Sequence, residues 1–77
     1  MNKNIEKEKT TALKELGLKI AKARLSKGYN QYELSRMLGR NRSFINHIET
    51  GSTNISYYSL LEICESLGIT LKQLLDL

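Results

Sequence analysis

Four polar side chains near the middle of the sequence have the types and spacing needed to recognise a ligand by hydrogen bonding. They are Arg42, Ser43, Asn46 and His47. In a helix that buries Ile45 and Ile48, these neighbouring positions point away from the core. An α-helix fits the major groove of B-DNA, where arginine can pair with guanine, asparagine can pair with adenine, and serine can pair with several bases. The pattern therefore predicts direct contacts to DNA bases.

The elements that must position these side chains are two short helices joined by a tight turn. We predict the first helix over residues 31–38 and the second over residues 41–50, with Asn41 as the N-cap of the second. Ser35 is small enough for a close helix crossing, and Gly39 tolerates the positive φ of the turn. Two such helices form the helix-turn-helix motif. Four apolar residues should fix the angle between them: Leu34, Leu38, Ile45 and Ile48.

The sequence predicts neither a catalytic site nor a metal site. No serine, cysteine or acid is placed to form a nucleophile–base pair with His47, so we predict no catalytic residue and no enzyme activity. Cys64 is the single cysteine, and without a histidine cluster we expect no metal site and no cofactor. Glu49 would be repelled by phosphate, so we predict that it makes an internal polar contact or caps a neighbouring helix.

Length, composition and charge favour one small domain that binds nucleic acid. The chain has 77 residues, of which 40% are hydrophobic and 26% are charged. Its net charge is +4, and residues 1–50 contain eleven of the twelve lysines and arginines. This basic part is a candidate surface for a polyanion. No apolar stretch is long enough for a membrane span or a secretion signal, so we expect a cytoplasmic protein with no membrane partner.

Apolar periodicity and helix-end signals predict an all-α, compact five-helix domain over residues 10–77. The first helix should run from about residue 11 to residue 26, with Gly17 permitting close packing. Residues 1–9 are expected to form a mobile, polar tail, with a minor-groove arm as the alternative. Asn30 should cap the second helix, and Ser56 and Thr70 should cap the last two. In the fourth helix we expect one shared face of Tyr57, Leu60, Leu61, Cys64 and Leu67.

From about residue 16 to residue 75, the sequence resembles the Cro/cI type of helix-turn-helix regulator, which has a lambda-repressor-like fold. The residues that match its recurring pattern are Gln31, Leu34, Ser35, Gly39, Ile45, Ile48, Glu49 and Gly51. The resemblance implies that Arg42, Ser43, Asn46 and His47 contact bases and that Gln31 contacts phosphate. Arg40 stands where the family usually has an apolar residue, so the turn packs more loosely or Arg40 reaches a phosphate. The candidate contacts to the DNA backbone are Gln31, Arg40, Asn41 and Thr53, although Thr53 stands where a basic residue is common.

The resemblance further implies a transcriptional regulator that binds an inverted-repeat operator as a homodimer. The C-terminal helices should form the dimer, because residues 71–77 contain Leu71, Leu74, Leu75 and Leu77, more apolar surface than a short helix can bury beneath itself. The alternative is that all four leucines complete the monomer core.

Two more specific hypotheses stay open. The segment from Arg42 to Ile45, with the exit loop at residues 54–56, resembles the controller proteins of restriction-modification systems. Many chromosomal and phage regulators share these features. An antitoxin-type protein-interaction module with secondary DNA binding is the main alternative, although the chain has no long tail to wrap around a toxin.

Overall fold

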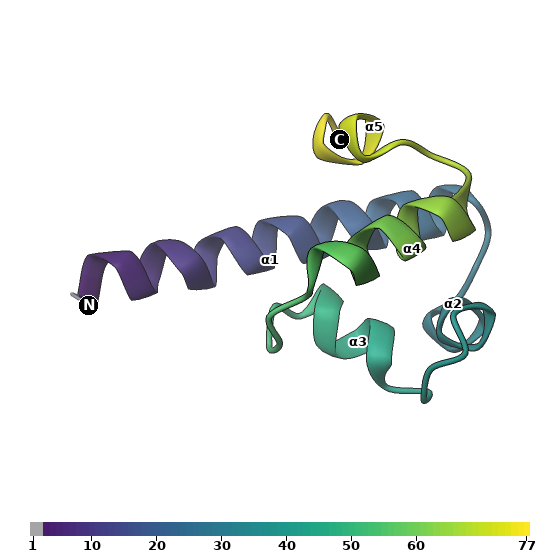
Figure 1. Ribbon diagram of the computed structural model, residues 1–77, viewed down its shortest axis with the longest axis horizontal. Coiled ribbons are helices and arrows are strands. Elements are labelled where there is room, and N and C mark those ends of the chain that lie inside the picture. The colour runs from purple at the N-terminus through teal and green to yellow at the C-terminus, as the bar shows by residue number, and fades with distance from the viewer. Residues whose placement is uncertain (1–2) are drawn as a thin grey trace.

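The computed structural model describes residues 3–77, which form five helices and no strand (Figure 1). The helices are α1 (Lys3–Ser26), α2 (Gln31–Met37), α3 (Phe44–Glu49), α4 (Tyr57–Leu67) and α5 (Leu71–Leu75). Helix α1 packs against both α3 and α5, and these two short helices lie on opposite sides of it (Figure 1). The predicted all-α, five-helix fold is confirmed.

Helix α1 begins at Lys3, well before the start predicted near residue 11. Residues 5–10 are all exposed, so no buried face marks these turns in the sequence. Glutamate and lysine are nevertheless strong helix formers, and they allow the helix to extend beyond the other elements (Figure 1). The predicted start is wrong because apolar periodicity detects only turns that pack. The assignment of residues 1–9 to a separate mobile tail stays a prediction, and residues 1–2 lie outside the described residues.

Three helices begin at the capping residues that the sequence indicates. Asn30 Oδ1 accepts a hydrogen bond from Glu33 N at 2.7 Å, and Glu33 Oε1 accepts one from Asn30 N at 2.9 Å. Thr70 and Gln73 form the same reciprocal capping box at the start of α5. Ser56 Oγ accepts from Ser59 N at 3.0 Å. These bonds satisfy backbone N–H groups that have no partner within the helix.

The core is built from apolar side chains of every helix. Its fully buried members include Ile20, Leu34, Ile45, Ile63 and Leu74. Gly17 brings α1 against the end of α3, because a Cβ at this position would lie 2.7 Å from Ile48 O and closer still to Glu49 O. The predicted role of this glycine in close packing is confirmed.

The buried face of α4 differs in part from the predicted one. Leu60, Cys64 and Leu67 are buried as predicted, but Tyr57 is 66% exposed and Leu61 is 39% exposed. Ile63 is fully buried instead. Helix α4 has apolar residues on more than one face, so spacing alone did not determine which of them would pack against the core.

The leucines at the C-terminus divide between the core and the surface. Leu74 is fully buried and Leu71 is partly buried against the core, whereas Leu75 is 46% exposed and Leu77 is 45% exposed. The alternative in which all four leucines complete the monomer core is therefore wrong.

Candidate nucleic-acid interface

The crossing of α2 and α3 fixes the orientation of the candidate interface. Ser35 is fully buried at the crossing, and its Oγ accepts a hydrogen bond from Ile45 N at 3.2 Å. Gly39 has φ +67°, the left-handed conformation expected of the turn. The buried Ile45 and Ile48 hold the inner side of α3 against the core. The predicted helix-turn-helix geometry is therefore present, and Ser35 contributes a hydrogen bond as well as a small volume.

Helix α3 starts at Phe44, three residues later than predicted, and Asn41 is not its N-cap. Asn41 Oδ1 instead accepts hydrogen bonds from Ser43 N at 3.1 Å and from Ser43 Oγ at 2.9 Å. Asparagine often stabilises such turns by bonding to the backbone two residues further on. Ser43 occupies the N-cap position without a side-chain capping bond. The end predicted at Thr50 is the C-cap, so the helix is shorter than predicted at both ends.

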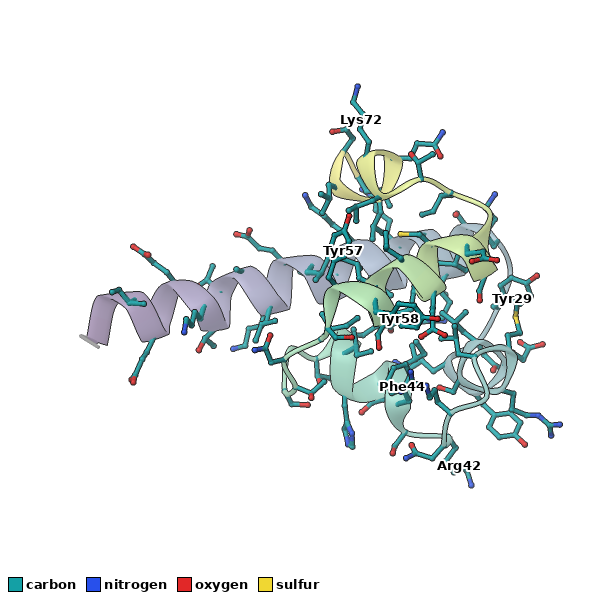
Figure 2. All side chains as sticks on the ribbon, viewed as in Figure 1. Tyr29, Arg42, Phe44, Tyr57, Tyr58 and Lys72 are labelled. Atoms are coloured by element: carbon teal, nitrogen blue, oxygen red, sulfur yellow. The ribbon has the colours of Figure 1, made fainter. Side chains whose placement is uncertain are left out.

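The four side chains predicted to contact bases lie on or just before the outer side of α3. Arg42, Asn46 and His47 are exposed, while Ser43 is partly buried in the turn. Figure 2 shows Arg42 projecting from the turn, on the side of the molecule away from Lys72 of α5. We call Arg42, Ser43, Asn46 and His47 the candidate recognition surface. The contacts that these residues make to DNA stay a prediction.

A buried ion pair beneath this surface joins α1 to the last residue of α3. Arg24 Nε donates to Glu49 Oε2 at 2.7 Å and Arg24 Nη2 donates to Glu49 Oε1 at 3.0 Å, with both side chains less than one-tenth exposed. Arg24 Nη1 also donates to Tyr29 O at 2.8 Å. The predicted internal polar contact of Glu49 is confirmed. The sequence analysis did not identify Arg24. The available signal was its position directly after Ala23, on the buried side of α1.

The hydrogen bonds of Glu49 continue to the candidate recognition surface. Gln31 Nε2 donates to Glu49 Oε1 at 2.9 Å, and Asn46 Nδ2 donates to Gln31 Oε1 at 3.3 Å. The amide of Gln31 therefore has an internal partner for each of its two polar atoms. We call Arg24, Glu49, Gln31 and Asn46 the polar chain.

Arg42 of the candidate recognition surface and the neighbouring Arg36 of α2 both lie over the ring of Tyr32. The Arg42 guanidinium lies 5.7 Å from the centre of the Tyr32 ring, and the Arg36 guanidinium lies 5.8 Å from it. Arg36 Nη1 also donates to Tyr32 Oη at 3.3 Å, and this bond and charge lower the pKa of Tyr32. Sequence reasoning left Tyr32 undetermined, although its spacing of four from Arg36 places the two on one side of α2. Tyr32 thus restricts the position of Arg42 through a cation–π contact.

The residues predicted to contact the DNA backbone surround the same surface. Gln31 is the first residue of α2, Arg40 and Asn41 lie in the turn, and Thr53 is exposed in the loop after α3. Arg40 lies 4.7 Å from the centre of the Phe44 ring and 3.3 Å from Glu62 Oε1. Arg40 therefore covers the apolar ring of Phe44, which accounts for a cation at this position in the turn. The phosphate contacts themselves stay predictions.

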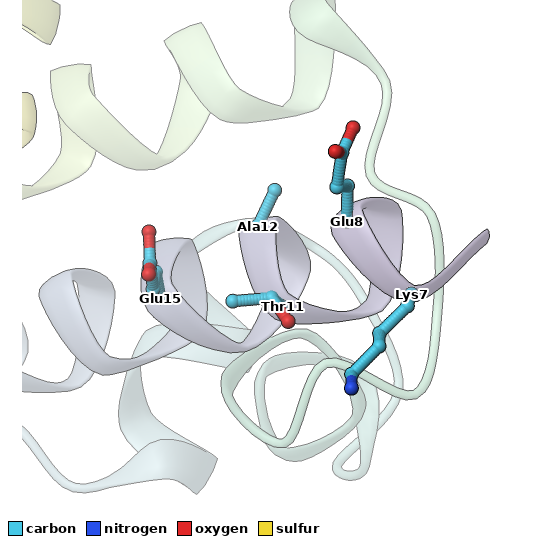
Figure 3. A pocket seen from close by; sticks show the side chains of 5 residues that line it. All are labelled: Lys7, Glu8, Thr11, Ala12 and Glu15. Atoms are coloured by element: carbon cyan, nitrogen blue, oxygen red, sulfur yellow. The ribbon is translucent and has the colours of Figure 1, made fainter. Parts of the chain in front are cut away.

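The described part of the chain also has a hollow on α1, apart from the candidate recognition surface. The hollow in Figure 3 is lined by Lys7, Glu8, Thr11, Ala12 and Glu15. All five belong to α1, so a ligand there would meet a single helix. Among residues 3–77, no three histidines, cysteines or acids lie close enough to hold a metal ion. No helix in the described part of the chain is long and apolar enough to cross a membrane.

Comparison with known proteins agrees with this geometry. The helix-turn-helix family matches residues 20–74, which is most of the chain. Neither a curated protein nor a solved structure matches the chain significantly. The match covers the whole of α2, the turn, α3 and α4, together with residues 20–26 of α1 and residues 71–74 of α5. The chain therefore belongs to the helix-turn-helix family, as a Cro/cI-type DNA-binding regulator.

Proposed function

We propose that this chain is a sequence-specific transcriptional regulator that recognises operator DNA through the candidate recognition surface. One observation carries the proposal: α3 presents polar side chains outward while its inner side is fixed by Ile45, Ile48 and the buried carboxylate of Glu49. A reader of bases must hold its donors and acceptors in a fixed geometry, since each base pair is distinguished by the positions of its edge groups. The surface supplies such donors on a rigid support.

Each side chain of the candidate recognition surface suits a different contact. Arg42 can donate two hydrogen bonds to guanine, and Asn46 can pair with adenine. His47 and Ser43 add further hydrogen-bonding groups on the same side. Gln31, Arg40, Asn41 and Thr53 surround these residues and would contact the phosphates on either side of the groove, contacts that set the position of the helix without specifying sequence.

We further propose that the regulator binds as a homodimer to an inverted repeat. A six-residue helix makes few base contacts, and two-fold dimers on repeated half-sites double them. Leu75 and Leu77 are exposed at the end of the chain, where a second copy could cover them. This end lies on the opposite side of α1 from α3, so a partner there leaves the candidate recognition surface free (Figure 1). A small dimer of this kind fits a repressor or a controller protein.

The proposal is tested by selecting bound duplexes from random DNA and titrating the selected site at several salt concentrations. We expect an enriched inverted repeat whose half-sites lie about one helical turn, roughly 34 Å, apart. Affinity should fall steeply with salt, because lysine and arginine contacts to phosphate release counterions. Selection that enriches no sequence, or an affinity independent of salt, would contradict the proposal.

A further inference from the structure

We propose that Gln31 is a positioning residue that sets the orientation of the Asn46 amide and thereby makes α3 distinguish adenine from guanine. The inference rests on the proposed function, because it takes Asn46 to contact a base. It names Gln31, a residue outside the candidate recognition surface, as the cause of one base preference.

The direction of every hydrogen bond in the polar chain follows from the charge at its buried end. The Glu49 carboxylate is held by Arg24, and an ionised carboxylate can only accept hydrogen bonds. Gln31 must therefore turn its Nε2 toward Glu49, at 2.9 Å, and its Oε1 away from it. That Oε1 can only accept, so Asn46 must present its Nδ2, at 3.3 Å. Each amide has one orientation that satisfies its partners.

The fixed orientation of Asn46 leaves a defined pair of groups for DNA. One N–H of Nδ2 is used by Gln31, and the remaining N–H and the Oδ1 are free. In the major groove, adenine presents an acceptor at N7 beside a donor at N6, which matches this pair. Guanine presents two acceptors, N7 and O6, so the Asn46 Oδ1 would meet O6 without a hydrogen between them. An Asn46 amide that is free to turn over could offer its amino group to guanine instead.

The test compares variants on the selected operator and on duplexes in which single A·T pairs are replaced by G·C. Asn46→Ala first identifies the position that Asn46 contacts, as the one where the preference changes. Gln31→Met keeps the length of the side chain and removes both amide bonds, leaving the Arg24–Glu49 ion pair in place. At that position we expect Gln31→Met to reduce the preference for adenine over guanine by about tenfold, within the range of one bidentate base contact.

Three further variants separate positioning from a general structural effect. The double variant Gln31→Met with Asn46→Ala should have the preference of Asn46→Ala alone, because Gln31 acts through Asn46. Gln73→Met makes the same replacement in the capping box of α5 and should leave the preference unchanged. Glu49→Gln replaces the acceptor-only group by an amide that can turn either way, and it should relax the same position. Thermal unfolding shows which variants are folded. If Glu49→Gln does not fold, the result for Gln31→Met alone tests the positioning role.

The outcomes distinguish this inference from the proposed function. If Asn46→Ala changes the preference at one position and Gln31→Met leaves the adenine-to-guanine ratio at the wild-type value, the positioning role is wrong and the proposed function stands. If Asn46→Ala changes the preference at no position, Asn46 does not contact a base. The proposed base contact of Asn46 and the positioning role of Gln31 are then both wrong.

Discussion

Helix α3 has six residues and helix α5 has five, and both pack against α1 through buried apolar side chains. What they leave exposed is different. Around α3 the exposed groups are arginine, asparagine and histidine, and beneath them lies a buried ion pair. At α5 they are Leu75 and Leu77 beside Lys72. Helix α1 thus supports a polar surface of fixed geometry at α3 and an apolar surface at α5. The polar surface suits DNA, and the apolar surface suits a protein partner.

The first way to test this difference is to remove the buried carboxylate under α3. Glu49→Ala leaves the Arg24 guanidinium buried without its partner, and breaking a buried ion pair in this way costs about 3–5 kcal/mol of unfolding free energy. Denaturant unfolding measures the loss. The matched control is Glu62→Ala, which breaks the partly exposed pair with Arg40 and should cost about 1 kcal/mol or less. Equal losses of unfolding free energy in the two variants would show that the buried pair under α3 stabilises the fold no more than the partly exposed pair does.

The crossing of α2 and α3 gives the next largest effect. Ser35→Leu forces a large side chain into a fully buried site, and such overpacking typically costs about 1–3 kcal/mol. Ser35→Ala is the control, since it removes only the hydrogen bond from Ile45 N. Thermal unfolding of both variants separates volume from hydrogen bonding. A Ser35→Leu protein as stable as wild type would mean that this residue is not at the crossing point.

The smallest effect on stability is expected at the apolar end. Replacing Leu75 and Leu77 together by serine should change the unfolding free energy of the monomer by about 0.5 kcal/mol or less, because both side chains are half exposed. Dimerisation and operator binding should weaken together. Sedimentation and DNA titration measure the two effects, and Leu74→Ala is the contrasting variant, with a stability loss of about 2–5 kcal/mol. A monomeric variant with undiminished operator affinity would refute the dimer.

Much of this architecture could be predicted from the sequence because it depends on local signals. Asn30, Ser56 and Thr70 each cap a helix through a bond to a residue three positions away, and Gly39 adopts the positive φ of the turn. Such features need only neighbouring residues. The match of Ser35, Gly39, Ile45 and Ile48 to a known pattern supplied the geometry of α2 and α3.

The remaining features depend on contacts between distant residues or on competition between equivalent ones. Arg24 and Glu49 are 25 positions apart, and no local pattern pairs them. Helix α4 has several apolar residues in sequence, and only packing against the other helices determines that Ile63 is buried and Tyr57 is not. Asn41 could cap either a helix or a turn, and it stabilises the turn. The polar chain joins residues of α1, α2 and α3, so it depends on how these three helices pack together.

The most direct measurement of the central claim compares Arg42→Ala with Arg40→Ala on a panel of duplexes that covers every single-base change in the selected operator. Arg42→Ala should cost about 1–3 kcal/mol on the preferred site and relax the choice of base at one position, because a bidentate contact to guanine is lost. Arg40→Ala should weaken all duplexes by a similar factor, as expected for a contact to phosphate. If Arg42→Ala instead weakens specific and non-specific duplexes equally, and Asn46→Ala and His47→Ala leave the base preference unchanged, then α3 does not recognise bases.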